Sequence, residues 1–177
     1  MNLQNMITES ICSSAANVFS TMLGQDLPQG EASLEQGTPE PNDGVVSFIG
    51  IAGTWAGTGS ISCSPALACR ICSQMLMMEA ASVDAEVLDA VAELTNMIIG
   101  NVKTDLEQHL GPLGLSIPTV VFGRNFKTRS AGKQEWIVVN FYWDGDPLTV
   151  KLCLAPNERT AHHSAAAVVN HHYTLEV

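Results

Sequence analysis

Basic residues are scarce in this sequence of 177 residues. Lys and Arg number 8 against 18 Asp and Glu, which makes the formal net charge −10. An acidic surface repels the phosphates of nucleic acids and the anionic head groups of membranes. The composition therefore argues against nucleic acid and membrane as partners, and solubility is the ordinary use of such a charge.

Long apolar runs are also absent. No stretch approaches the ~18 consecutive apolar residues that typify a membrane-spanning helix. The opening MNLQNMITES has neither the basic region nor the apolar run of a signal peptide. We therefore expect a cytoplasmic protein. Its cysteines are odd in number, so free thiols are expected at all of them: Cys12, Cys63, Cys69, Cys72 and Cys153.

Hydrophobic residues make up 46 % of the chain and charged residues 15 %, as in an ordinary globular domain. A domain of this length buries about 70 % of its extended surface, so it needs no disulfide or metal to form a core. We expect one domain over residues 1–156. Residues 157–177 lack a clear period and are expected to form a C-terminal tail.

Hydrophobic periodicity predicts an α+β fold in which long helices pack on an antiparallel sheet. Helices are expected over residues 4–23, 65–79 and 84–110. Strands are expected over residues 45–51, 55–63, 115–122, 135–143 and 148–154.

Turn chemistry accounts for the connections. Asp144-Gly145-Asp146 is the signature of a tight hairpin turn. Residues 24–43 are rich in proline and glycine and too polar to bury, so we expect a loop or linker there, with room for a short edge strand. Gly57 and Gly59 are expected to weaken the second strand or to mark a bulge in it.

The third predicted helix has two faces of different chemistry. Its apolar stripe is Leu88, Val91, Thr95, Ile98, Val102 and Leu106. The second stripe lies ~130° away, at 100° per residue, and consists of Asp89, Glu93, Asn96, Gly100 and Lys103. A polar stripe is ordinarily solvated. A glycine within it costs about 1 kcal/mol relative to alanine, which indicates close approach by another surface or close packing within the domain.

This stripe matches a family signature. ELTNMIIGNVKTDLE, followed by LSIPTVVFG, resembles the motif of the CheC/CheX family of chemotaxis phosphatases. The motif is Asp or Ser, Glu four positions later, Asn three further on and a distant proline. It falls here on Asp89, Glu93, Asn96 and Pro118. The segments ITESICSSAANVFSTMLG and FIGIAGTWAGTGSISCSPALACRICSQML also resemble CheX, so the resemblance covers residues 5–156.

The resemblance distinguishes two types of member. CheC-type members carry the Glu and Asn pair twice, whereas the first helix here has Glu9 followed three positions later by Cys12. Cysteine lacks the paired donor and acceptor of a carboxamide. The chain therefore resembles the CheX type, which implies one site per subunit and a homodimer built by sheet edges.

The resemblance implies a phosphatase acting on the phospho-aspartate of a CheY-like receiver. Glu93 and Asn96 would be catalytic, with Glu93 pairing with the receiver's lysine as in the family. The Asn96 amide oxygen can hold the attacking water and does not titrate. Partner contacts would come from Asp89, Gly100 and Lys103. No cofactor of its own is expected, whereas Mg²⁺ is expected in the receiver.

One alternative is a non-catalytic CheX-like module that docks a receiver in a signalling or flagellar-switch assembly. The intact Glu93 and Asn96 favour the enzyme, because a docking module has no need of the carboxamide. Which receiver is cognate stays open in the sequence.

Other constellations have ordinary explanations. Cys69 and Cys72 form a CxxC that lies about five residues inside a predicted helix, where buried thiols are more usual than a redox or metal pair. The pairs His162-His163 and His171-His172 match no zinc module, so a polar tail is expected.

The sulfur-bearing and aromatic side chains also have structural explanations. Core filling or a dimer surface would explain Met75, Met77 and Met78 at a helix end. Packing within strands would explain Trp55, Trp136 and Trp143.

Overall fold

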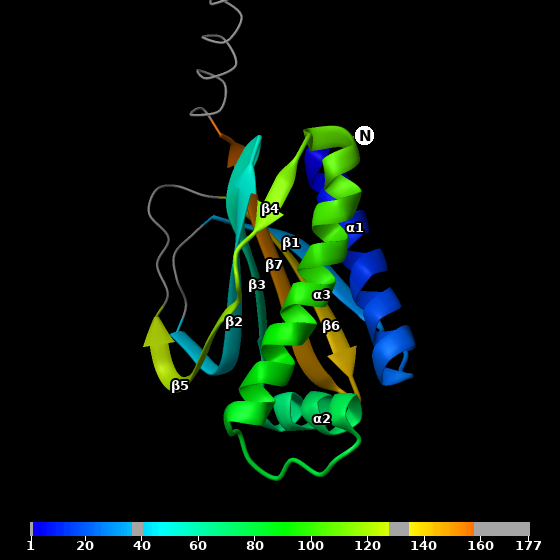
Figure 1. Cartoon of the computed structure of the whole chain (residues 1–177), viewed down its shortest axis with the longest axis vertical. Coiled ribbons are helices and arrows are strands. Elements are labelled where there is room, and N and C mark those ends of the chain that lie inside the picture. Colours follow the sequence, from blue (N-terminus) through cyan, green and yellow to red (C-terminus); the bar gives the residue numbers. More distant parts are fainter. Residues whose placement is uncertain (1, 37–40, 128–134, 158–177) are drawn as a thin grey trace, which may run out of the picture.

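The computed structural model describes residues 2–36, 41–127 and 135–157, where three helices pack on a seven-stranded antiparallel sheet (Figure 1). This confirms the expected α+β class. The helices are α1 (Leu3–Val18), α2 (Pro65–Leu76) and α3 (Ala85–Leu110), and a π-helical turn, η1 (Phe19–Leu23), extends α1. The strands are β1 (Gln29–Gln36), β2 (Pro41–Gly53), β3 (Trp55–Cys63), β4 (Leu113–Leu115), β5 (Thr119–Lys127), β6 (Glu135–Trp143) and β7 (Asp146–Pro156).

The sheet has the order β1-β6-β7-β3-β2-β4. β4 pairs with residues 51–53 of β2, and β5 pairs with residues 41–48 of the same strand. β4 and β5 therefore follow one another along the outer side of β2, and β1 forms the opposite edge. The predicted turn joins β6 to β7, with positive φ at both Asp144 and Gly145, as a two-residue hairpin requires.

The longest helix, α3, is fastened at both ends. The Asp84 carboxylate accepts a hydrogen bond from the Val87 N–H at 3.0 Å and caps the first turn, which satisfies one of the free backbone donors there. At the other end, the Thr54 hydroxyl donates to the Leu110 carbonyl at 2.6 Å. The helix is therefore a rigid support for the side chains that it carries.

The inner face of α3 is the centre of the core. Leu94, Ile98 and Ile99 are fully buried. Ile99 lies directly on the backbone of β3, since a Cβ at Gly59 would come within 3.0 Å of three of its side-chain atoms. β3 pairs with both neighbours without a register shift, so the expected bulge is absent, and Gly59 instead makes room for the helix.

The segment 24–43, expected as a loop or linker with room for a short edge strand, contains the eight-residue edge strand β1, whose side chains are nearly all exposed. Two other expected boundaries were wrong. The helix expected over 65–79 ends at Leu76, because Met77 takes a left-handed conformation with φ 53. The strand expected over 115–122 divides into β4 and β5 around Pro118.

Two further expectations can be compared with the structure. All five cysteines are free thiols, as predicted. In the described ranges, no helix is both long enough and apolar enough to cross a membrane. The His pairs and the rest of the expected tail, residues 158–177, lie outside the described residues.

Candidate functional site

The outer face of α3 carries the predicted site residues in an exposed row. Asp89, Glu93 and Asn96 are exposed, and the spacings of four and three residues place them on one side of the helix. At 1.5 Å per residue the row extends over roughly 10 Å. The sequence spacing therefore predicted the orientation of these side chains correctly, although it says nothing about their chemistry.

Gly100 continues this row by one helical turn. A Cβ at this position would meet only the Leu115 Cδ1 atom, at 4.0 Å, apart from the helix's own backbone. An alanine would therefore fit the chain as it stands. Close packing within the domain therefore does not explain this glycine.

Lys103 ends the row and is already engaged within the chain. Its Nζ lies 2.7 Å from Glu107 Oε2, and the other oxygen of that carboxylate accepts from the Leu113 N–H at 2.9 Å. The hydrogen bond from Lys103, and then the one from Leu113, lower the pKa of Glu107. Lys103 thus helps to hold α3 against β4.

The motif proline lies in a short, well-anchored segment between β4 and β5. The Ser116 N–H donates to the Gly50 carbonyl at 2.9 Å, and the Gly50 N–H donates back to Ser116 Oγ at 2.8 Å. The same hydroxyl donates to the Ile117 carbonyl at 2.9 Å. These bonds hold Pro118, and they present Ile117 with 86 % of its surface exposed.

Sequence reasoning missed Ile117, because we placed it inside a continuous strand. The signal that could have revealed it is Pro118, since proline cannot donate to a sheet and breaks the pairing of a central strand. An exposed isoleucine next to the motif proline is a candidate contact residue.

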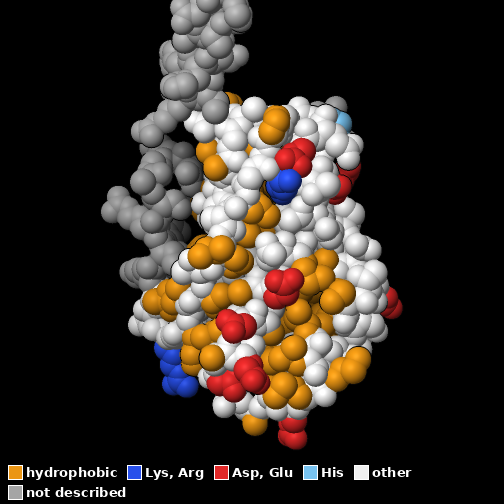
Figure 2. All heavy atoms as spheres, viewed as in Figure 1, with side chains coloured by type: hydrophobic (Ala, Val, Ile, Leu, Met, Phe, Trp, Pro, Cys, Tyr) orange, Lys and Arg blue, Asp and Glu red, His pale blue; other side chains and the backbone are white. Residues whose placement is uncertain are grey.

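Negative charge dominates the surface around the row. Residues 71–102 contain Glu79, Asp84, Glu86, Asp89 and Glu93 but no lysine or arginine. The preceding cation, Arg70, is paired with Asp146 at 2.6 Å. Figure 2 shows acidic side chains set among hydrophobic ones on this face of the molecule. Such a face suits a partner that offers positive charge and apolar surface together.

The CxxC is built from thiols that are held in the protonated form. Cys72 is buried and Cys69 half-buried in α2, and burial, followed by the negative charge of Asp84, raises the pKa of each. Burial also raises the pKa of Cys63 to about 12. Reactive thiols need the opposite shift, so the explanation as structural thiols fits. Across the described ranges, no group of three or more metal-binding side chains occurs.

A cleft of about 360 Å³ lies elsewhere, between α1 and α3. Its lining includes Glu9, Ser10 and Asp105, and the Ser10 hydroxyl donates to the Asp105 carboxylate at 2.9 Å. Asp105 is nine residues, or roughly 13 Å, from Asn96 along the helix. The cleft is therefore separate from the exposed row.

The fold and the site together define a class: α+β proteins that display a carboxylate and a carboxamide on the outer face of a helix fastened to an antiparallel sheet. The family model described as "Chemotaxis phosphatase CheX" matches residues 45–142. CheY-P phosphatase CheX of Thermotoga maritima is 33% identical over 128 residues, which are 71% of this chain and 81% of that protein. The chain belongs to the CheX family of chemotaxis phosphatases.

Solved structures agree on the fold. A CheC-like superfamily protein from Shewanella sp. PV-4 has a TM-score of 0.75 and 28% sequence identity, over 88% of this chain and 99% of that one. The CheX of Borrelia burgdorferi, solved as a CheX-CheY-BeF3-Mg²⁺ complex, has a TM-score of 0.72 and 24% identity, over 84% of this chain and 97% of that one.

Proposed function

We propose that this protein removes phosphate from the phospho-aspartate of a CheY-like receiver. The observation that carries the proposal is the joint exposure of Glu93 and Asn96 on a helix fastened at both ends. Its family membership supports it, since the Thermotoga maritima relative is a CheY-P phosphatase.

The phosphatase has to contribute little to this reaction beyond positioning. An aspartyl phosphate is a reactive acyl phosphate, and phosphoryl transfer depends mainly on positioning and electrostatics. A hundredfold acceleration needs about 2.7 kcal/mol off the barrier, which ordered placement of a water molecule can supply. In our proposal the Asn96 side-chain oxygen accepts a hydrogen bond from that water and aims it at phosphorus, while its NH₂ group donates elsewhere.

The other residues of the row dock the receiver. Glu93 is assigned as the anchor, because its exposed carboxylate can pair with a lysine beside the phosphorylated aspartate. Asp89 adds negative charge one turn earlier, and Gly100 lets the receiver's surface come close to the helix. Lys103 is assigned to the rim of the docking surface, since its Nζ is already bonded to Glu107.

Metal, compartment and assembly complete the proposal. We assign the divalent metal to the receiver rather than to this chain, and the Mg²⁺ in the Borrelia burgdorferi complex with CheY supports this.

The protein is proposed to act in the cytoplasm as a two-fold homodimer joined through a sheet edge, because an unpaired edge is a liability that dimerisation removes. Light scattering at micromolar concentration should give twice the mass of the chain, and the mass of one chain would refute the dimer.

The deciding experiment separates rate from affinity in two variants. Asn96→Ala should release phosphate from a phosphorylated receiver at least about a hundredfold more slowly while it binds the receiver as wild type does. Glu93→Ala should lose affinity as well as rate, because the receiver's lysine then has no partner. Both side chains are exposed, so the free energy of unfolding should change by less than about 0.5 kcal/mol in each variant.

One readout is phosphate release from phosphorylated receivers of the same genome. The other is a binding titration with the same receivers activated by beryllofluoride, a stable mimic of the phosphoryl group. If Asn96→Ala matches wild type in rate with a receiver that binds, the catalytic assignment is wrong and the chain is a docking module. If wild type neither binds nor dephosphorylates any of those receivers, the proposed function itself is wrong.

A further inference from the structure

The row on α3 is too narrow to hold a receiver by itself. A specific protein interface buries about 800 Å² on each partner, whereas Asp89, Glu93 and Asn96 form a single line of side chains. The rest of the contact area has to come from surface beside that line. Any such surface is expected to be apolar at its centre, because the core of an interface is depleted of charge and enriched in aromatic residues and methionine.

One flank of the row has this character. Exposed or half-buried apolar side chains from η1, the end of α2 and the middle of α3 gather there, and we call them the methionine face: Met22, Leu76, Met77, Met78 and Met97. Met22 and Leu76 are each 50 % exposed, Met78 is 44 % exposed and Met77 is 95 % exposed. Isolated exposed apolar residues are normal, but a contiguous group of them marks an interaction surface.

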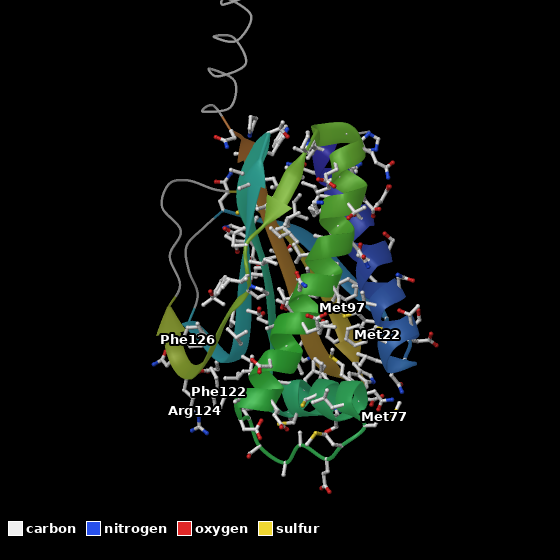
Figure 3. The ribbon with its side chains drawn as sticks, in the orientation of Figure 1. Met22, Met77, Met97, Phe122, Arg124 and Phe126 are labelled. Carbon is white, nitrogen blue, oxygen red and sulfur yellow. The ribbon has the colours of Figure 1, made fainter. Side chains whose placement is uncertain are left out.

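A hydrogen bond joins two of the elements that carry this face. Gln74 in α2 donates its side-chain amide to the Leu23 carbonyl of η1 at 3.0 Å, which brings the Met22 turn beside the end of α2. Met97 directly follows Asn96, lies one turn after Glu93 and packs partly against the core. Figure 3 shows Met22, Met77 and Met97 on the same flank of α3, and Figure 2 shows hydrophobic side chains there.

The backbone at Met77 is a second and independent observation. This residue ends α2 in the left-handed region, with φ 53 and ψ 40. Glycine is the usual residue at that position because it has no Cβ to strain. Met77 is 95 % exposed, so packing within the chain offsets little of the strain. Unfavourable backbone conformations persist mainly where function uses them.

We propose that the methionine face is the apolar half of the receiver-docking surface. This rests on the proposed function, and the occupant is the part of the receiver that surrounds its phosphorylated aspartate and lysine. Residues 71–102 carry negative charge and contain no lysine or arginine, so this surface attracts the receiver's lysine. The methionines then cover the receiver's apolar surface beside that lysine. Methionine side chains are flexible and adapt to differently shaped partners, so the face also suits recognition of more than one receiver.

The test uses one variant that removes a side chain of the methionine face and one that makes the face polar. Met77→Gly removes the exposed side chain and the backbone strain together. It should unfold at a higher urea concentration than wild type while it binds the beryllofluoride-activated receiver about tenfold more weakly. The double variant Met22→Gln and Met97→Gln makes the face polar at nearly constant volume. It should raise KM about tenfold and leave kcat unchanged, because Asn96 is intact.

Leu34→Gln is the matched control. Leu34 is as exposed as Met22, at 50 %, but belongs to the edge strand β1, where it lies opposite Ile137 of β6. Its substitution should leave receiver affinity and KM at the wild-type values.

The outcomes separate this inference from the function on which it rests. Wild-type KM and affinity in both methionine variants, with wild type itself active, would refute the docking role and leave the phosphatase standing. Loss of the dimer in these variants, with receiver affinity kept, would assign the face to a second copy of the chain. If wild type binds and dephosphorylates no receiver, both proposals fall together.

Discussion

The two faces of α3 differ in burial and in chemistry. The inner face is apolar and fully buried around Leu94, Ile98 and Ile99. The outer face is exposed and carries Glu93 and Asn96 on the same turns of the helix. Substitution inside should therefore change stability, and substitution outside should change activity. A single helix can serve both demands because 3.6 residues per turn separate the two sets of positions.

Two glycines sharpen this comparison, because they lie on opposite sides of the same helix. Gly59 is beneath α3, where a Cβ would meet Ile99 at 3.0 Å. Gly100 is on the outer face, where a Cβ would meet one atom at 4.0 Å. The fold requires the first glycine and tolerates a side chain at the second. Packing within the chain thus explains Gly59 but not Gly100.

The largest expected effect is on the inner face. Ile98→Ala should lower the free energy of unfolding by about 2–5 kcal/mol, since it leaves a cavity in a fully packed core. Urea unfolding would measure this, and Ile98→Val is the control, with an expected loss of about 0.5–1.5 kcal/mol. Phosphatase activity per folded molecule should stay near the wild-type value. A hundredfold loss of that activity would show that the faces are not independent.

Gly59→Ala should have the next largest effect on stability. The new methyl group has to displace Ile99 or lift α3 from β3, and overpacking of this kind costs about 1–3 kcal/mol. Chemical denaturation would measure the loss. Compensation by the second substitution Ile99→Val, in a double-mutant cycle, would confirm that the two side chains collide. Unchanged stability in Gly59→Ala would contradict the close approach.

Gly100→Ala should act in the opposite direction. Alanine replaces glycine in a helix interior with room for its methyl group, so the protein should gain about 1 kcal/mol of stability. The same methyl group should weaken receiver binding if the partner approaches the helix closely. A binding titration would show it. A variant that is more stable and binds as well as wild type would remove Gly100 from the docking surface.

The smallest effect concerns Glu107, which bonds Lys103 and the Leu113 N–H. These bonds lower the pKa of Glu107 in the folded protein, so the ionised carboxylate stabilises the fold. That contribution to the free energy of unfolding is complete above the ordinary glutamate pKa of about 4.3, and it is lost as the pH falls through the lowered pKa. Glu107→Gln should therefore be slightly less stable than wild type at pH 7, and the difference should vanish in acid. Urea midpoints across this range would measure it, and a difference that grows in acid would contradict the assignment.

Local patterns predicted much of the fold. The period of Val91, Ile98 and Val102 placed α3 and its buried face, and Asp144-Gly145 placed the last hairpin, because both signals act between residues close in sequence. The edge strand β1 was expected only as an option within a loop, without bounds, because its polar side chains resemble those of a loop. Pairing with β6 creates that strand, and the partner lies roughly a hundred residues away in the chain.

By itself, the sequence determined the α+β class, the exposed row of Asp89, Glu93 and Asn96, and the family, since helical spacing and a motif are properties of the chain. Only the tertiary structure showed that Lys103 is engaged with Glu107, that Gly100 has free space and that Met77 ends α2 in a left-handed conformation. The space at Gly100 depends on which atoms of other elements surround it, and these become neighbours only when the helices pack on the sheet. The Lys103–Glu107 pair and the Met77 torsion are local, but the sequence allows other rotamers and another helix end, so the folded chain decides both.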